Sequence, residues 1–120
     1  MKTHESPEDY LEAIYVINKN TGDVRSVDIA AYFGYTKASV SVAMKKLRES
    51  GHILMDRYGK ITLTDSGLAI ASKVFERHEV ITAFLIRLGV DEKVAENDAC
   101  RMEHIISQET FEKFKDFLQK

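Results

Sequence analysis

The sequence has little of three residue types: its 120 residues contain one cysteine, one proline and no tryptophan. One cysteine cannot form an internal disulfide, which favours a reducing compartment. No stretch approaches the roughly 18 consecutive apolar residues that a membrane span requires. Residues 1–6 contain neither an apolar core nor a cleavage signal, so export is not expected. We therefore expect a cytoplasmic protein with no membrane partner.

What the sequence does contain is typical of a folded domain. Hydrophobic residues make up 44% of the chain and charged residues 30%, the balance of a globular protein rather than a disordered one. The net charge is only −2, but residues 37–60 carry six basic and two acidic side chains between two net-negative flanks. Such a basic segment indicates a surface that faces DNA, although a solvated helix face would show the same pattern.

Local signals in the first half of the chain predict three helices and then a two-stranded hairpin. Caps, turns and apolar periodicity place these elements near residues 7–20, 27–33, 37–50, 52–56 and 60–64. Ser6 is expected to cap the first helix and Ser26 the second. Helix, helix, tight turn, helix and hairpin is the order of a winged helix-turn-helix.

The third predicted helix would enter the major groove of DNA in such a fold. Val40, Met44 and Leu47 recur at helical spacing and form its inward face, which leaves small polar and basic residues outside. The residues predicted to contact bases or phosphates from this helix and from the wing are Thr36, Lys37, Ser39, Ser41, Val42, Lys45, Lys46, Arg57 and Lys60. Val42 cannot hydrogen-bond a base, so a thymine methyl group is its expected contact. The alternative is a winged helix retained for protein interaction.

The second half predicts three further helices, which makes the protein mostly α. They are a long helix from the cap at Thr64 to about Leu88, a helix near residues 91–106, and an amphipathic helix that begins at Ser107. The residues expected to form the buried stripe of the long helix are Ala71, Val74, His78, Ile81, Leu85 and Leu88. We expect a winged helix-turn-helix domain over residues 1–70 and a helical metal-binding and dimerisation domain over residues 71–120.

The most informative stretch of the chain lies on the second of these helices. Cys100, Glu103 and His104 stand at positions i, i+3 and i+4, which brings a thiol, a carboxylate and an imidazole onto one helix face. Sulfur, nitrogen and charged oxygen together suit a first-row transition metal such as Fe(II), Ni(II), Zn(II) or Mn(II). Cys100 alone has the alternative role of a small buried hydrophobe, but the triplet favours a metal.

Three further residues are candidate ligands. Asp9 and Glu12 share a face of the first helix, and a carboxylate pair opposite the triplet would complete a shell of the right size. Each candidate has an alternative: the two acids would also stabilise a helix N-terminus, and His78, in an apolar stripe, would also serve as a hydrogen-bonded core histidine.

A resemblance to a known family rests on four segments. They are Ser6-Pro7-Glu8-Asp9-Tyr10-Leu11-Glu12-Ala13-Ile14-Tyr15, Thr62-Leu63-Thr64 with Gly67, Arg77-His78-Glu79, and Cys100-Arg101-Met102-Glu103-His104. With them the chain resembles, over nearly all its length, the diphtheria toxin repressor and manganese transport regulator family of metal-dependent repressors. The resemblance implies a homodimer that binds operator DNA when loaded with Fe(II) or Mn(II) and lowers expression of metal-uptake genes. Because the sequence ends at Lys120, a two-domain form without an SH3-like domain is expected.

The resemblance also implies a ligand set. The positions that match family ligands are Asp9, Glu12, His78, Cys100, Glu103 and His104. Asp9 and Glu12 match the manganese branch, whereas Cys100 matches the iron branch, because the manganese branch has a glutamate there. The ancillary site of the iron branch falls on Thr82 and Glu96, so that site is changed, although Glu96 lies one turn before Cys100 and is a usable ligand.

Other classes of function fit less well. An enzyme would use Cys100 with His104 or His78 as nucleophile and base, but no segment resembles an oxyanion hole, so none is expected. A structural zinc site would have a closed shell dominated by cysteine and histidine, whereas three of the candidates are carboxylates. A winged-helix regulator that senses another ligand, with this cluster as a structural zinc site, stays the alternative.

Overall fold

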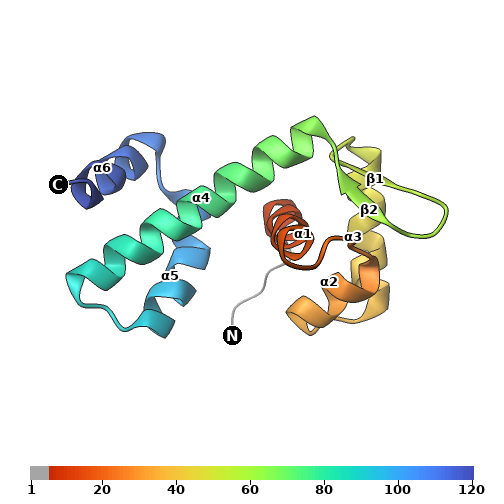
Figure 1. Ribbon diagram of the computed structural model, residues 1–120, viewed down its shortest axis with the longest axis horizontal. Coiled ribbons are helices and arrows are strands. Elements are labelled where there is room, and N and C mark those ends of the chain that lie inside the picture. The colour runs from red at the N-terminus through yellow and green to blue at the C-terminus, as the bar shows by residue number, and fades with distance from the viewer. Residues whose placement is uncertain (1–5) are drawn as a thin grey trace. The chain divides into compact units, whose positions relative to one another are not determined.

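The computed structural model describes residues 6–120, which form helices and one small sheet (Figure 1). The elements are α1 (Pro7–Thr21), α2 (Ser26–Phe33), α3 (Lys37–Glu49), β1 (Ile53–Met55), β2 (Ile61–Leu63), α4 (Asp65–Leu88), α5 (Glu92–Ile105) and α6 (Gln108–Leu118). The chain divides into two compact units, Met1–Ser72 and Lys73–Lys120, and α4 begins in the first and continues into the second. The predicted fold class, a winged helix-turn-helix followed by helices, is confirmed. Across residues 6–120, no helix has the length and apolarity needed to span a bilayer.

Side-chain caps start most helices of the first unit where the sequence predicts them. The hydroxyl oxygen of Ser6 accepts the backbone N–H of Asp9 at 3.1 Å, and the Thr36 hydroxyl at the start of α3 likewise accepts the N–H of Ser39 at 3.1 Å. The predicted cap at Ser26 is wrong, because α2 begins one residue earlier. Arg25 holds the N-cap position, and its backbone N–H donates to the Asp28 carboxylate at 2.9 Å.

The core of the first unit is apolar and draws on every element there. Its buried residues are Tyr10, Leu11, Ile14, Val24, Ile29, Ala30, Val40, Met44, Leu47, Ile53, Ile61 and Ala71. The inward stripe of α3 is therefore as predicted. The two strands pair antiparallel, with Ile53 opposite Leu63 and Met55 opposite Ile61. Ile53 and Ile61 are buried, whereas Leu54 is 64% exposed, as the period of two along a strand requires.

The turn of the hairpin, which forms the wing, is organised by one carboxylate. Asp56 accepts the backbone N–H groups of Tyr58 at 2.8 Å and of Lys60 at 2.9 Å. The hydrogen bond from Lys60 is the main reason why the pKa of Asp56 lies below its usual value. Gly59 has a φ of +83°, a left-handed conformation that glycine adopts without steric cost. These bonds organise the backbone of the wing tip, where Arg57 lies.

Gly67 in the first turn of α4 is required by a close approach of backbone. A Cβ atom at this position would collide with the carbonyl oxygen of His52. The Thr64 hydroxyl accepts the N–H of Gly67 at 3.2 Å and donates to the carbonyl of Gly51 at 2.8 Å. The start of α4 is thus tied to the segment that joins α3 to the wing.

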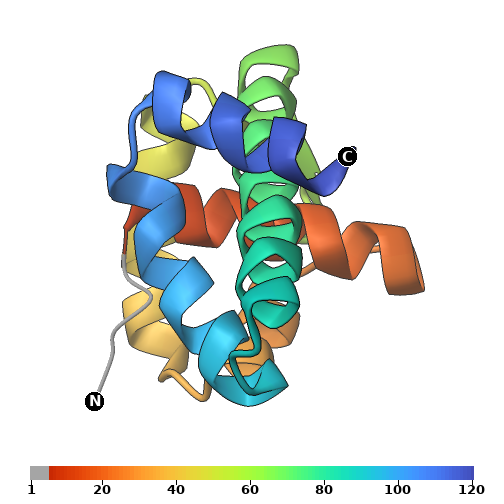
Figure 2. The ribbon, with the colours of Figure 1, turned by 90° about the vertical axis from the view of Figure 1, so that its left-hand side faces the viewer.

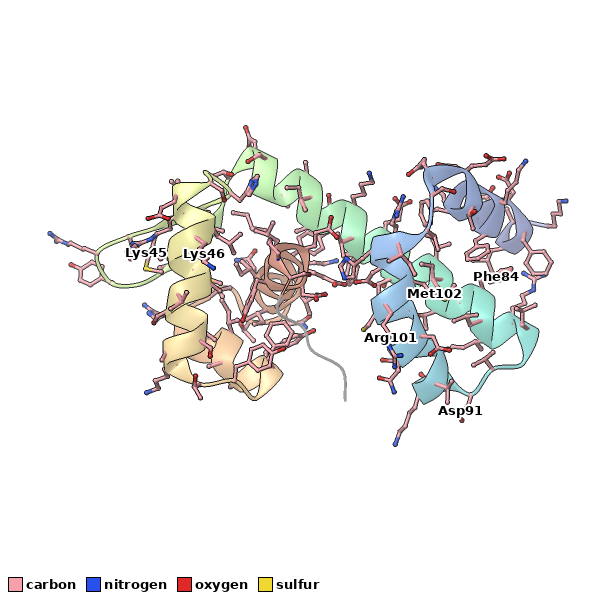
Figure 3. All side chains as sticks on the ribbon, turned by 180° about the vertical axis from the view of Figure 1, so that it is seen from behind. Lys45, Lys46, Phe84, Asp91, Arg101 and Met102 are labelled. Carbon is pink, nitrogen blue, oxygen red and sulfur yellow. The ribbon has the colours of Figure 1, made fainter. Side chains whose placement is uncertain are left out.

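In the second unit, α5 and α6 pack against the second part of α4 (Figure 2). The buried apolar residues there are Val74, Ile81, Ala95, Ala99 and Phe111. Phe84, labelled in Figure 3, stacks on Phe114 with 4.1 Å between ring centroids. Leu88, predicted to be buried, is 60% exposed, and in this last turn of α4 it is Arg87 that contacts the end of α6.

Candidate metal centre and nucleic-acid interface

Four of the predicted ligands gather in the second unit. His78 projects from α4, and Cys100, Glu103 and His104 project from α5. The Nδ1 atom of His78 lies 2.9 Å from Oε1 of Glu103 and 3.9 Å from Sγ of Cys100. The Nε2 atom of His104 lies 3.5 Å from Oε2 of Glu103. The i, i+3, i+4 spacing on α5 brings its three side chains together, and packing on α4 adds the fourth.

Glu103 is the most constrained member of this cluster. Its side chain is 0% exposed, and among the described residues its Oε2 atom has no hydrogen-bond partner. A buried carboxylate oxygen without a hydrogen-bond partner is costly unless a cation compensates its charge. The cluster offers a carboxylate, two imidazoles and a thiol, a donor set that suits Fe(II) or a neighbouring divalent transition metal. The residues present therefore fit a metal ion.

The neighbours of His78 favour the protonated form of its imidazole in the metal-free cluster. Its hydrogen bonds to Cys100 and Glu103 raise the pKa of His78 to about 10, although burial acts in the opposite direction. A histidine binds a metal through a neutral ring nitrogen. A cation at this site would therefore replace the proton that His78 holds between the thiol and the carboxylate.

The two predicted ligands of α1 belong to the first unit. Asp9 accepts a hydrogen bond from the Ser6 hydroxyl at 2.9 Å, so it takes part in the cap of its own helix, as the alternative for this residue anticipates. Glu12 lies three residues further along α1, on the same face. The geometry is thus compatible with a capping role for Asp9, and a role in metal binding rests on its chemistry and its sequence context.

The two positions that match the ancillary site of the iron branch, Thr82 and Glu96, do not belong to the cluster of four gathered side chains. Glu96 is exposed on α5, and within residues 6–120 no group of candidate ligand atoms includes it. The hydroxyl oxygen of Thr82 is buried and has no hydrogen-bond partner among the described residues. The structure does not bring Glu96 to the four gathered side chains.

The outer face of α3 carries the residues predicted to contact DNA. The exposed positions there are Thr36, Lys37, Ser39, Ser41, Val42, Lys45 and Lys46, and Figure 3 shows Lys45 and Lys46 on this helix. Val42 is 57% exposed although it is apolar. Beside the helix lies a groove of about 630 Å³, and Ser39, Val42 and Lys46 line it together with Pro7 and Tyr10 of α1.

The wing supplies further basic groups. Arg57 is exposed, lies over the Tyr58 ring at 5.1 Å and donates to the Tyr58 hydroxyl at 3.0 Å. Lys60 forms an exposed ion pair with Asp23 at 3.4 Å. Arg25, which is not among the residues predicted to contact DNA, donates from Nε to the Tyr58 carbonyl at 3.4 Å. A basic residue at the start of the second helix was the only signal for it, and its proximity to the wing depends on the fold.

Comparison with known proteins gives the family. The family model described as "Iron dependent repressor, N-terminal DNA binding domain" matches residues 2–61, and the one described as "Iron dependent repressor, metal binding and dimerisation domain" matches residues 64–120. The chain therefore belongs to the iron-dependent repressor family of metal-dependent transcriptional repressors, the family of the diphtheria toxin repressor and the manganese transport regulator. The resemblance seen in the sequence is confirmed.

Similar proteins are transcriptional regulators, not enzymes. An uncharacterized HTH-type transcriptional regulator of Methanocaldococcus jannaschii is 37% identical over 97% of this chain and 94% of its own length. The transcriptional regulator MntR of Escherichia coli O6:H1 is 37% identical over 94% of this chain and 73% of its own length. Among solved structures, the manganese regulator SloR is 28% identical, with a TM-score of 0.84 over 99% of this chain and 55% of that one.

Proposed function

We propose that this protein binds operator DNA as a homodimer when it is loaded with Fe(II) or Mn(II), and that it thereby represses genes of metal uptake. The first domain, residues 1–70, contacts DNA, and the second, residues 71–120, binds the metal and dimerises. The observation that carries the proposal is the buried Oε2 atom of Glu103, which lacks a hydrogen-bond partner within the described residues while two imidazoles and a thiol lie around its carboxylate.

The residues that would hold the metal are Asp9, Glu12, His78, Cys100, Glu103 and His104. When bound, the cation supplies the positive charge that this carboxylate-rich set lacks. The Cys100 thiolate favours a softer, later metal, whereas Asp9 and Glu12 favour hard Mn(II). Because affinity in general rises from Mn(II) to Fe(II), iron under reducing conditions is the preferred assignment. The manganese regulator SloR, among the similar solved structures, makes Mn(II) the other candidate.

The distribution of these ligands accounts for regulation. Asp9 and Glu12 belong to the DNA-binding domain, and the other four belong to the second domain. Without a cation, the carboxylates of the two ligand sets would repel one another and would not hold the domains in one arrangement. With both sets of ligands engaged, the two recognition helices of a dimer would acquire a defined spacing, which suits half-sites about 34–36 Å apart or a multiple of that distance. This is a population shift toward the state that binds the ligand better.

The decisive experiment is a titration of metal against DNA binding. A palindromic operator, selected from a random DNA library in the presence of Fe(II) and without oxygen, is bound by the dimer with added Fe(II), with Mn(II), or with chelator. We expect micromolar metal to tighten binding by tenfold or more, a coupling of about 1.4 kcal/mol.

Two results would contradict the proposal. Equal operator affinity with chelator and with metal would show that metal does not regulate the protein. A chelator that unfolds the second domain, with only Zn(II) able to restore it, would indicate the structural zinc site instead.

A further inference from the structure

Arg77 is a buried cation that holds the end of α5. It is 9% exposed, and its Nη1 atom donates to the backbone carbonyls of Glu103 at 3.2 Å and Ile106 at 3.0 Å. Its Nη2 atom donates to the side-chain oxygen of Gln108 at 3.0 Å, just inside α6. The guanidinium also lies 5.3 Å from the centre of the Phe111 ring. The carbonyls in the last turn of a helix lack hydrogen-bond donors within the helix. Arg77 supplies a donor to two carbonyls at the end of α5.

The same arginine reaches a residue of the candidate metal centre. Arg77 and His78 are neighbours on α4, and both bind Glu103. Arg77 holds its backbone carbonyl, and His78 holds its carboxylate at 2.9 Å. Glu103 is therefore fixed from α4 at both ends, which sets where its Oε2 atom points.

We propose that Arg77 is a positioning residue of the metal centre: through the Glu103 carbonyl it fixes the ligand face of the last turn of α5. The inference rests on the proposed metal-binding function. Groups that orient metal ligands contribute to affinity without touching the metal, and their loss costs about 10–100-fold. Arginine suits this task because its planar fork donates several hydrogen bonds in a fixed geometry, whereas lysine offers a single point charge.

A second arginine on α4 provides a control for the loss of hydrogen bonds at a helix end. Arg87 donates to the carbonyls of Leu118 and Lys120, each at 3.3 Å. Its guanidinium lies 5.4 Å from the centre of the Phe117 ring. Arg87 thus does for the end of α6 what Arg77 does for the end of α5, but it binds no candidate ligand. Arg87 is exposed whereas Arg77 is buried, so Arg87 controls for the loss of helix-end hydrogen bonds, and the folded fraction accounts for the difference in burial.

The test is a Co(II) titration of the full chain, without oxygen and with a mild reductant. Co(II) lies next to Fe(II) in the affinity order, and its sulfur-to-metal absorption band reports coordination by Cys100. Arg77→Met and Arg77→Lys are compared with Arg87→Met and Arg87→Lys, and far-UV circular dichroism measures the folded fraction. We expect both Arg77 variants to raise the Kd for Co(II) about tenfold or more and to alter the absorption bands. Both Arg87 variants should stay within twofold of the wild type with unchanged bands.

Each other outcome has a definite meaning. A folded Arg77 variant with wild-type affinity and bands would overturn the inference and leave the proposed function standing. Equal losses in the Arg77 and Arg87 variants would show a general structural role and overturn it as well. If Arg77→Met does not fold, Arg77→Lys decides. If neither folds while the Arg87 variants do, Arg77 serves stability alone and the inference is wrong. Wild-type protein that binds no Co(II) would instead refute the metal centre, and the inference with it.

Discussion

The two units of this protein differ in the kinds of residue that they bury. The first unit has an apolar core in which Leu11, Ile29 and Val40 are at most 1% exposed, and the carboxylate that it buries, Asp9 at 9%, accepts a hydrogen bond from Ser6. The second unit places Arg77 and Glu103 among its buried residues, at 9% and 2% exposure. Apolar burial stabilises a fold without any ligand, whereas a buried charge needs compensation. The difference teaches that the core of the first unit needs no ligand, whereas the second unit buries a carboxylate oxygen that a cation would compensate.

The largest effect on stability is expected in the apolar core. Leu11→Ala removes a side chain that is 1% exposed and should lower the free energy of unfolding by about 2–5 kcal/mol, measured by urea denaturation of the metal-free protein. Leu54→Ala on the wing, where the side chain is 64% exposed, should change it by less than about 0.5 kcal/mol. Similar losses for both variants would show that the first unit is not organised around this core.

The next effect separates metal response from folding. Glu103→Ala should abolish metal-activated operator binding while the dimer stays folded, because the variant removes the buried carboxylate. Glu96→Ala, on the exposed part of the same helix, is the control and should keep the full response. The measurement is operator affinity with and without Fe(II), together with sedimentation of the dimer. A full response in Glu103→Ala would mean that the gathered side chains are only structural.

A smaller change concerns the choice of metal. Cys100→Glu replaces a soft ligand by a hard one and should move the preference toward Mn(II). We expect the ratio of free Fe(II) to free Mn(II) at half-maximal operator binding to rise about tenfold, a change of about 1.4 kcal/mol. The wild type should respond at a lower free concentration of Fe(II) than of Mn(II). A wild type that prefers Mn(II), with Cys100→Glu unchanged, would exclude Cys100 as a ligand.

The smallest effects are expected at single contacts with DNA. Lys45→Ala and Arg57→Ala should weaken binding to all sequences about equally, and each should reduce the salt dependence by about one unit of slope, because these are phosphate contacts. Ser41→Ala should change sequence preference more than affinity. Lys113→Ala, an exposed position on α6, is the control. Unchanged DNA binding in the Lys45, Arg57 and Ser41 variants would place the DNA on another surface.

Much of the fold could be predicted because its signals are local. The caps at Ser6 and Ser107 lie within one turn of the backbone groups that they bind, so the starts of α1 and α6 follow from short stretches of sequence. The N-cap residue of α2 was not identified correctly from the type of side chain alone. Ser26 has the typical side chain, but the Asp28 carboxylate binds the backbone of Arg25 and starts the helix one residue earlier.

The candidate site likewise has a part that the local sequence predicts and a part that depends on how the helices pack. The sequence by itself determined that Cys100, Glu103 and His104 share a face, because they lie within four residues of one helix. Only the tertiary structure decided that His78 and Arg77 both bind Glu103, from positions 25 and 26 residues away. It also decided that Oε2 of Glu103 is buried with no hydrogen-bond partner in the described part of the chain. Which faces of α4 and α5 meet depends on the packing of whole helices, and no spacing within a single helix encodes that choice.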